Sequence, residues 1–193
     1  MSKGDFTGSC GNLVSNTIKT VEKDFKDAFD PSKTIQPSDR FPDFKLPDAT
    51  GKEVTRDVLL ANGPILISFY RGEWCPYCNL ELQALQRHLP EFRQKGVSLV
   101  AISPELPDQS LSMAEKNGLE FTVLSDVGNR LSRQLGILFA QPDAMRSVLG
   151  RLQVPIPATI LVDKQGTVRN TFIDPSWQKR LEPATALKWI DEL

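Results

Sequence analysis

Short apolar runs alternate along this chain with segments in which apolar residues recur every three or four positions. A continuous apolar run bounded by turn residues is typical of a buried strand. Such runs predict strands at 65–70, 97–102, 121–124 and 157–163. Lys164-Gln165-Gly166 then predicts a hairpin turn, and we expect the returning strand at 167–173.

Segments with apolar residues at helical spacing follow most of these strands. They predict helices at 56–61, 81–95, 108–117, 129–135 and 183–193. We expect Pro90 to kink the second of these helices rather than end it. On the last helix, Leu187, Ile190 and Leu193 should face inward. Strand–helix alternation followed by a hairpin and a helix indicates an α/β fold, with a central mixed β-sheet flanked by helices.

Two segments are less regular. Two short extended pieces around an Asp/Gly turn are expected within 42–54. The segment 140–153 is ambiguous, with a helix expected at 143–149.

The N-terminal part of the chain differs from the rest in its pattern. Apolar residues fall on one side of a helix over 12–29, which indicates an amphipathic helix that ends at Asp30-Pro31. A linker is expected over 32–41. We therefore divide the chain into an N-terminal helical extension with its linker, 1–40, and a main domain, 41–193. Two uses of the helix stay open: packing on the domain, or a dimer or partner surface.

Composition narrows the classes of partner. The 193 residues carry a net charge of −1, with 40% hydrophobic and 24% charged residues, which gives no support for a nucleic-acid partner or a polybasic membrane surface. No apolar stretch approaches the roughly 20 residues that span a bilayer. Because the first residues lack the apolar core of a signal peptide, the expected location is the cytoplasm.

The candidate chemistry lies in Trp74-Cys75-Pro76-Tyr77-Cys78, between a predicted strand and a predicted helix. A helix N-terminus presents unpaired N–H groups and a positive dipole end, which stabilise a thiolate, the form that attacks. Three cysteines do not make a disulfide scaffold. A structural zinc site needs four ligands, and only Cys10 and His88 would add to the pair, so we expect no metal. No phosphate-binding glycine loop appears either, so we expect no bound cofactor and an external reductant.

These motifs resemble the thioredoxin fold. The longer pattern resembles the peroxiredoxin-like subgroup, with a thioredoxin-type Cys-x-x-Cys, of the alkyl hydroperoxide reductase/thiol-specific antioxidant superfamily. The resemblance covers roughly residues 40 to 193, and the segments that support it are 69–82, 99–104, 124–129, 155–159 and 180–183. It implies a thioredoxin-like α/β fold, here with an N-terminal amphipathic helix as an extension.

The chain departs from the peroxiredoxin pattern where peroxide would be bound. That pattern is Pro-x-x-x-Thr/Ser-x-x-Cys with a distant arginine. Aligning its cysteine with Cys78 puts Cys75 at the hydroxyl position and Arg71 at the proline position. In that pattern the arginine ordinarily lies about six residues before an Asp-containing turn. Six residues before Asp163 this chain has Pro157. The replacements are similar to the thioredoxin pattern instead.

The thioredoxin resemblance implies a role for each site residue. Cys75 would be the exposed nucleophile and Cys78 the resolving cysteine. Trp74 would shield the site, with a plain core tryptophan as the alternative. Pro76 and Tyr77 match the dipeptide of dithiol glutaredoxins. Pro157 would form a cis peptide bond with Ile156 and leave the backbone of Ile156 free to pair with an extended substrate. The alternative is that Pro157 is a trans proline that opens the strand, and that Pro155 is the candidate for the cis proline.

Other polar residues near the motif have weaker predictions. Arg71 and Glu73 could tune the pKa of Cys75 or contact substrate, but solvated loop charges are the better expectation. His88 is expected to be structural or solvated. Cys10 is expected to be a free thiol, with a role as a second resolving partner as the alternative.

Three functions are compatible with the sequence. The leading one is a thiol–disulfide oxidoreductase that cycles Cys75 and Cys78 between dithiol and disulfide. The second is an antioxidant thiol peroxidase, with Cys78 peroxidatic and Cys75 resolving. The third is a non-redox scaffold or pathway protein. The expected partners are a disulfide-bearing protein or small molecule, or a peroxide, and a thiol reductant such as thioredoxin, glutathione or a flavin reductase; a homodimer is left open.

Overall fold

The computed structural model describes residues 23, 26–27, 29–140, 153–176 and 178–193. Contacts divide the chain into two units, Met1–Asp30 and Pro31–Leu193. In the first unit Lys23, Lys26 and Asp27 are helical, and the Lys23 ammonium lies 2.5 Å from the Asp27 carboxylate. Most of the amphipathic helix predicted at 12–29, Cys10 and the helix expected at 143–149 lie outside the described residues. The division into 1–40 and 41–193 stays a prediction.

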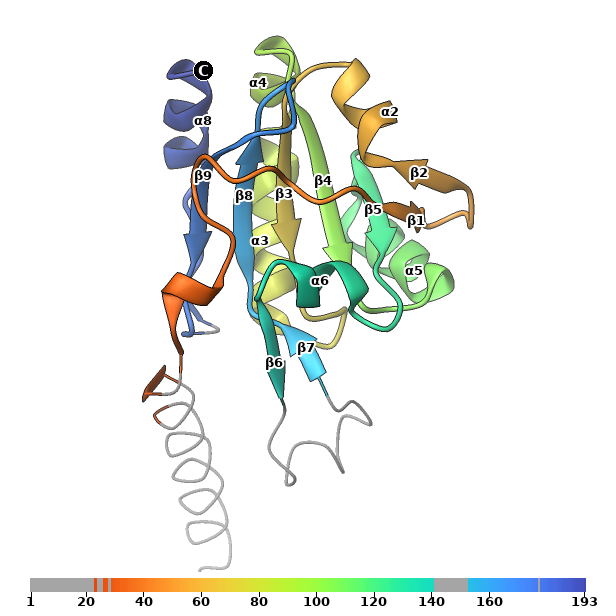
Figure 1. The fold of residues 1–193 in the computed structure, drawn as a ribbon. Coiled ribbons are helices and arrows are strands. Elements are labelled where there is room, and N and C mark those ends of the chain that lie inside the picture. Colours follow the sequence, from red (N-terminus) through yellow and green to blue (C-terminus); the bar gives the residue numbers. More distant parts are fainter. Residues whose placement is uncertain (1–22, 24–25, 28, 141–152, 177) are drawn as a thin grey trace, which may run out of the picture. The chain divides into compact units, whose positions relative to one another are not determined.

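The second unit is built on a five-stranded mixed sheet with the order β5-β4-β3-β8-β9 (Figure 1). The strands are β3 (Ile65–Phe69), β4 (Ser98–Ser103), β5 (Thr122–Ser125), β8 (Ala158–Val162) and β9 (Val168–Ile173). β3, β4 and β5 are parallel, whereas β8 runs antiparallel to β3 and β9 antiparallel to β8. This arrangement confirms the predicted α/β class and its mixed sheet. We call the end of the sheet at Phe69, Ser103 and Ser125 the carboxyl edge, and the end at Ile65, Ser98 and Thr122 the amino edge.

Helices connect these strands where the helical spacing predicts them. They are α2 (Arg56–Ala61), α3 (Pro76–Arg87), α4 (Leu89–Gln94), α5 (Pro107–Asn117), α6 (Arg130–Gln134) and α8 (Pro183–Asp191). On α8, Ala186 and Ile190 are buried and Leu187 packs on the core. Leu193 was expected to face inward as well, which is wrong: it lies beyond the end of α8 and is 45% exposed.

One helix prediction is wrong. The single kinked helix expected over 81–95 is two helices, and the first of them begins earlier, at Pro76. The break falls at His88, whose backbone N–H donates to Ala84 and Leu85. Pro90 has no N–H for the carbonyl four residues before it, and its ring would collide with that carbonyl. The chain therefore restarts as α4 instead of continuing through a kink.

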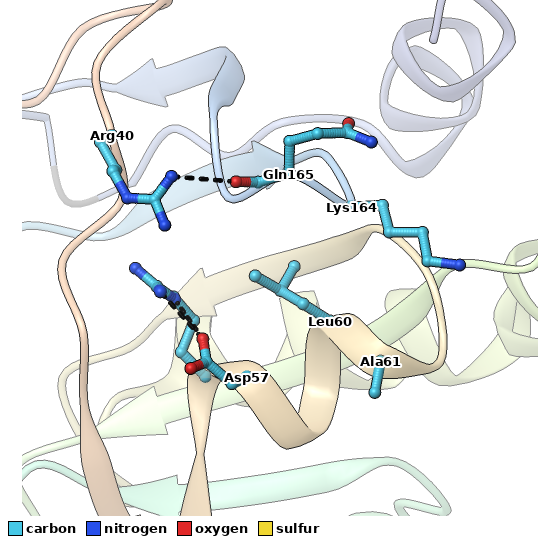
Figure 2. Close-up of a pocket in the computed structure, with 7 residues that line it drawn as sticks. Arg40, Asp57, Leu60, Ala61, Lys164 and Gln165 are labelled. Atoms are coloured by element: carbon cyan, nitrogen blue, oxygen red, sulfur yellow. Dashed lines mark hydrogen bonds and ion pairs between the residues drawn. The ribbon is translucent and has the colours of Figure 1, made fainter.

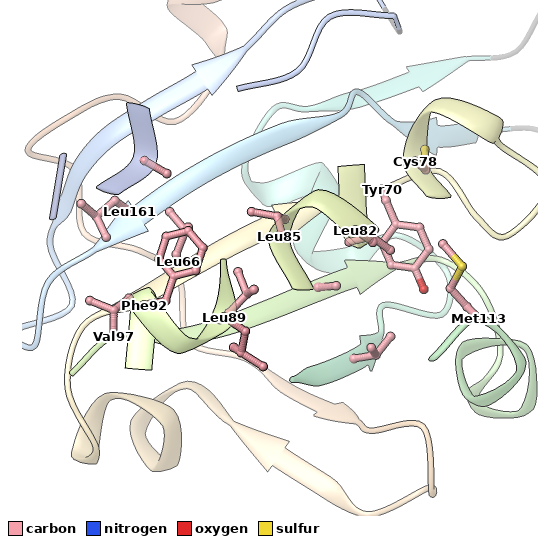
Figure 3. Close-up of a cluster of buried hydrophobic side chains, with 14 of the residues drawn as sticks. Leu66, Tyr70, Cys78, Leu82, Leu85, Leu89, Phe92, Val97, Met113 and Leu161 are labelled. Carbon is pink, nitrogen blue, oxygen red and sulfur yellow. The ribbon is translucent and has the colours of Figure 1, made fainter. Parts of the chain in front are cut away.

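The core on one face of the sheet joins α3, α4, α5 and α8 to the strands. Its buried residues include Leu66 of β3, Leu82 of α3, Phe92 of α4 and Met113 of α5. Cys75 and Cys78 belong to the same cluster. Figure 3 shows Cys78 and Tyr70 at one end of it and Leu161 and Val97 at the other. The two cysteines are thus built into the end of the core and not placed on a surface loop.

Smaller elements complete the unit. β1 (Lys45–Pro47) pairs antiparallel with β2 (Glu53–Thr55), which confirms the two extended pieces predicted within 42–54. β6 (Leu138–Ala140) pairs antiparallel with β7 (Gln153–Pro155). This second pair was not predicted, because three residues are too few to show a period in the sequence. Figure 1 places it at the carboxyl edge of the sheet.

The segment expected to be a linker over 32–41 is an ordered part of the second unit. A 3-10 helix, η1 (Pro31–Lys33), opens it. The Ile35 N–H then donates to the Leu135 carbonyl at 2.9 Å, and the Phe41 side chain is fully buried. The buried apolar residues in this stretch explain the difference, because their burial fixes the backbone between them. No helix in the part of the chain that the structure describes is long and apolar enough to cross a membrane.

Candidate active site

The Cys-x-x-Cys motif lies at the carboxyl edge, where β3 passes into α3. Cys75 is the N-cap of α3, and its backbone N–H donates to the Gly72 carbonyl at 3.1 Å. The N–H groups of Cys78 and Asn79 donate to the Cys75 carbonyl, both at 3.1 Å. Cys75 therefore sits at the positive end of the helix, and Cys78 lies in its first turn.

The two thiols face each other inside the protein. Both cysteines are free, and their Sγ atoms lie 2.7 Å apart, with Cys78 donating to Cys75. Cys75 is 2% exposed and Cys78 is fully buried. The expectation of an exposed Cys75 is wrong, because its side chain turns inward to Cys78 and joins the core.

The surroundings shift the two thiol pKa values in opposite directions. The hydrogen bond from the Cys78 thiol lowers the pKa of Cys75 to about 6, against the effect of burial. The Cys78 backbone N–H and the positive charges of Arg71 and Arg180 act in the same direction. Burial, and next the hydrogen bond given to Cys75, raise the pKa of Cys78 well above its usual value. At neutral pH the pair holds one thiolate, on Cys75, and one thiol, on Cys78.

Arg71 and Glu73 flank the motif in different environments. Arg71 is 6% exposed, and its guanidinium carbon lies 4.7 Å from the centre of the Trp74 ring. The expectation of a solvated charge is wrong for Arg71, because stacking on an aromatic face holds the guanidinium inside. Glu73 is partly exposed and pairs with Lys116 of α5 at 3.2 Å.

Two charged residues at the site were not among the predicted site residues. Arg180 Nε lies 2.5 Å from Glu81 Oε2, and Ser68 Oγ donates to Glu81 Oε1 at 3.0 Å. Arg180 Nη2 also reaches Cys78 Sγ at 3.4 Å. Burial raises the pKa of the Glu81 carboxyl. Both residues lie in segments that resemble the family, 69–82 and 180–183. That resemblance could have pointed to them as site residues.

This contact changes one sequence-based argument. Counting back from Asp163 found no arginine for a peroxidatic cysteine, but the structure brings Arg180 to Cys78 from a position 102 residues away. The hydroxyl position remains occupied by Cys75. Of the two peroxide-binding groups of the peroxiredoxin pattern, the arginine therefore has a spatial counterpart in Arg180, and among the described residues the hydroxyl has none.

Ile156 and Pro157 lie at the carboxyl edge, just before β8, whose Ala158 pairs with Phe69. Every peptide bond among the described residues is trans, so the predicted cis Ile156–Pro157 bond is wrong. The Ile156 N–H donates to the Ile137 carbonyl at 2.6 Å. This bond lies next to the unpredicted β6–β7 pair and occupies the backbone N–H that we expected a substrate to pair with.

The remaining predicted residues are more peripheral. Pro76 is the first residue of α3, and Tyr77 is 42% exposed. Tyr77 lines a groove of about 230 Å³ between α3 and residues 178–183, which Leu80, Leu181 and Arg180 also line. His88 makes a 3.1 Å contact to Glu91 at the surface, as expected of a solvated residue. Among the described residues, no three His, Cys, Asp or Glu side chains gather as metal ligands.

A second cavity lies at the opposite end of the sheet. It measures about 300 Å³ and is lined by Arg40, Arg56, Asp57, Leu60, Ala61, Lys164 and Gln165 (Figure 2). Because Ile65 pairs with Val162, the turn at Lys164 lies at the amino edge, away from the cysteines. The Arg56 guanidinium donates to the Phe41 carbonyl and pairs with Asp43 and Asp57. These contacts join residues 41–43 to α2.

A thioredoxin-like sheet with a polarised dithiol at a helix N-terminus defines a thiol-dependent oxidoreductase. The AhpC/TSA family matches residues 37–171, most of the chain, and the protein belongs to this family. The family resemblance, the fold class and the oxidoreductase class are thereby confirmed.

Individual relatives fall on both sides of the functional question. The chain is 26% identical over 159 residues to Peroxiredoxin Bcp of Escherichia coli (strain K12), covering 82% of this chain and 97% of that protein. It is 25% identical over 142 residues to the thiol-disulfide oxidoreductase ResA of Bacillus thuringiensis (strain Al Hakam), covering 73% and 72%. The crystal structure of Peroxidoxin BcpB from Mycobacterium tuberculosis matches with a TM-score of 0.72 and 25% identity, over 82% of this chain and 98% of that one. These similarities support a thiol redox function and fit either type of thiol chemistry.

Proposed function

We propose that this protein is a thiol–disulfide oxidoreductase in which Cys75 attacks and Cys78 resolves. The observation that supports this assignment is the opposite shift of the two thiol pKa values. The pKa of Cys75 is lowered to about 6, while that of Cys78 is raised well above its usual value. Since the thiolate is the nucleophile, Cys75 is the thiol ready to react at neutral pH.

The reaction proceeds by two exchanges. The Cys75 thiolate attacks one sulfur of the substrate disulfide, a mixed disulfide forms, and the other substrate sulfur leaves as a thiolate. Cys78 then loses its proton and attacks Cys75 Sγ, which releases the second substrate sulfur and leaves a Cys75–Cys78 disulfide. The Arg180 guanidinium, 3.4 Å from Cys78 Sγ, stabilises the Cys78 thiolate as it forms. The substrate gains two electrons, and an external reductant returns them to the protein.

A thiol peroxidase is the second candidate, and the contact between Arg180 and Cys78 favours it. In that reaction the Cys78 thiolate attacks the O–O bond, becomes a sulfenic acid and releases water or an alcohol. Cys75 then attacks the sulfenic sulfur and releases water. The raised pKa of Cys78 argues for the first candidate, because Cys78 would have to be a thiolate to attack a peroxide.

Single-cysteine variants separate the two candidates. We would measure insulin disulfide reduction and, by stopped-flow fluorescence, the rate of oxidation by hydrogen peroxide, with Cys10→Ser as the matched control. For an oxidoreductase, Cys75→Ser lowers disulfide reduction about a thousandfold or more, and Cys78→Ser accumulates a mixed disulfide. Disulfide reduction that survives Cys75→Ser would refute the proposal.

The rate of oxidation by hydrogen peroxide tests the peroxidase candidate. A rate near that of a free thiol in the wild-type protein supports disulfide exchange. A rate several decades faster, lost in Cys78→Ser and kept in Cys75→Ser, would make the protein a peroxidase. Cellular function that is unchanged in the double Cys75→Ser, Cys78→Ser variant would support the non-redox alternative.

The surroundings of the dithiol are proposed to bind the substrate. Trp74 and Pro76 border the cysteines, Tyr77 offers an exposed ring beside the groove along α3, and Ile156 and Pro157 lie at the same edge. The reductant is proposed to be thioredoxin, glutathione or a flavin reductase. We propose a cytoplasmic location, because a reducing compartment suits a dithiol that must be regenerated. A homodimer is proposed without assigning its interface.

A further inference from the structure

A buried carboxylate outside the Cys-x-x-Cys motif holds the loop that carries Cys75. Glu105 follows β4 and is 2% exposed. Its Oε1 and Oε2 atoms both accept the Glu73 backbone N–H, each at 3.0 Å. We call residues 71–75 the redox loop. We propose that Glu105 is a positioning residue, which fixes the redox loop so that Cys78 can donate its hydrogen bond to Cys75.

Gly72 shows how closely Glu105 fits the redox loop. Its φ of +144° is one that residues with a side chain rarely adopt. A Cβ atom there would lie 2.6 Å from Glu105 Oε1 and 2.6 Å from Trp74 Nε1. The carboxylate and the indole therefore occupy the space that a side chain at position 72 would need. Glu105 cannot be shortened without leaving a gap under the loop.

The carbonyl groups of the redox loop have tethers of their own, which do not involve Glu105. Asn79 Nδ2 donates to the Glu73 carbonyl at 2.7 Å and to the Cys75 carbonyl at 2.9 Å. Asn117 in turn donates to Asn79 Oδ1 at 3.0 Å. These bonds hold carbonyl groups from the side of α3 and α5. Glu105 holds the Glu73 N–H from the β4 side.

A positioning role and a purely electrostatic role predict opposite effects on Cys75. Removing a nearby negative charge stabilises the Cys75 thiolate and lowers its pKa. Releasing the redox loop weakens the hydrogen bond from Cys78, so the pKa of Cys75 rises instead. Of the charged groups that face the two thiols, Arg180 and Glu81 lie outside the redox loop. Arg71 belongs to the loop, and because its positive charge lowers the pKa of Cys75, moving it away acts in the same direction as losing the hydrogen bond.

Two variants of Glu105 make the test. Glu105→Gln removes the charge but keeps an oxygen that accepts the Glu73 N–H, whereas Glu105→Ala removes both. We would measure iodoacetamide alkylation of Cys75 in the reduced full-length protein across about pH 5–9, reading the Cys75 peptide by mass spectrometry. Asp108→Ala is the matched control, because Asp108 is an exposed acid three residues further along the chain, in the first turn of α5.

The positioning role predicts that Glu105→Ala moves the inflection of the alkylation rate to higher pH. At a pH below both inflections, alkylation should slow about tenfold if the inflection rises by one pH unit. Glu105→Gln should stay near the wild type. Equal movements to lower pH in both variants, or an unchanged inflection in Glu105→Ala, would overturn the inference. If Glu105→Ala does not fold, an inflection in Glu105→Gln below that of the wild type overturns it, and an unchanged one supports it.

The inference rests on the proposed role of Cys75, and the same data separate the two. If wild-type Cys75 shows no inflection near pH 6, the proposed function fails whatever the Glu105 variants do. If the wild type shows the inflection and Glu105→Ala leaves it unchanged, only the role of Glu105 fails.

Discussion

The two ends of the sheet each bury an arginine, but in opposite electrostatic settings. At the amino edge the Arg56 side chain is 6% exposed, and its partners Asp43 and Asp57 are 84% and 78% exposed. At the carboxyl edge the Arg180 side chain is 13% exposed, and its partner Glu81 is 4% exposed. One guanidinium is thus neutralised by carboxylates that remain hydrated, and the other by a carboxylate that does not.

This difference shows where burying charge changes chemistry. The carboxylates that compensate Arg56 stay hydrated, so only the guanidinium is desolvated, and its contacts join backbone segments. The pair of Arg180 and Glu81 is expensive to bury, and a well-packed apolar pair would be a cheaper way to fill the space. In return, the Arg180 guanidinium donates from Nη2 to Cys78 Sγ and places a positive charge beside both thiols. Strained electrostatics of this kind gather at functional sites.

The largest effect should come from breaking the buried pair. Arg180→Met leaves Glu81 buried without its cation, and we expect the free energy of unfolding to fall by about 3–5 kcal/mol. Urea unfolding of the reduced protein measures this loss. Adding Glu81→Gln to Arg180→Met should recover part of it, since no uncompensated charge then remains. A loss below about 1 kcal/mol in Arg180→Met would mean that the pair resembles the hydrated one at the amino edge.

The next effect is a pH dependence confined to the carboxyl edge. The pKa of Cys75 is about 6 in the folded protein and near its usual value of 9.0 in the unfolded chain. The thiolate therefore adds stability that is full above about pH 9, declines as the pH falls, and is lost below about pH 6. Between pH 6 and 8 the reduced protein should gain about 2–3 kcal/mol relative to Cys75→Ser. The opposing shift of Cys78 acts only above about pH 9, where the unfolded thiol ionises.

Urea unfolding at the two pH values, for reduced wild type and Cys75→Ser, checks this gain. Arg56→Met should retain the full pH dependence, because Arg56 lies at the other edge. A gain that persists in Cys75→Ser would place its origin elsewhere.

A smaller effect is expected from Arg56 itself. Arg56→Met removes the hydrogen bond to the Phe41 carbonyl and should lower the free energy of unfolding by about 1–2 kcal/mol. Cys75 alkylation should be unchanged, whereas Arg180→Met should slow it at neutral pH. Equal alkylation rates in the two arginine variants would show that Arg180 affects Cys75 no more than Arg56 does.

The smallest effect should be that of His88, at the break between α3 and α4. His88→Ala removes a surface contact to Glu91 and should change the free energy of unfolding by no more than about 0.5 kcal/mol. Thiol reactivity should not change. A clear loss of alkylation would show that this helix break influences the dithiol.

The predicted elements that agree with the structure depend on near neighbours in the chain. The buried strands at 65–69 and 158–162 are continuous apolar runs, and α2 is bounded by Thr55, which caps it, and Asn62-Gly63-Pro64. The helix predicted over 81–95 begins earlier, at Pro76, and breaks at His88, because the backbone geometry of Pro90 does not let the first helix continue. The occupied Ile156 N–H was missed for a different reason: it bonds to Ile137 next to the β6–β7 pair, and that pair leaves almost no periodic signal in the sequence.

The sequence by itself determined the type of chemistry. Two cysteines one helical turn apart, after a buried strand and before a helix, need only local rules to form a dithiol at a helix N-terminus. The tertiary structure decided which thiol is activated. Arg180 reaches Cys78 across 102 residues, Glu105 reaches Glu73 across 32, and the core closes over Cys75. Burial and charge set a thiol pKa, and both depend on groups that only the folded chain brings together.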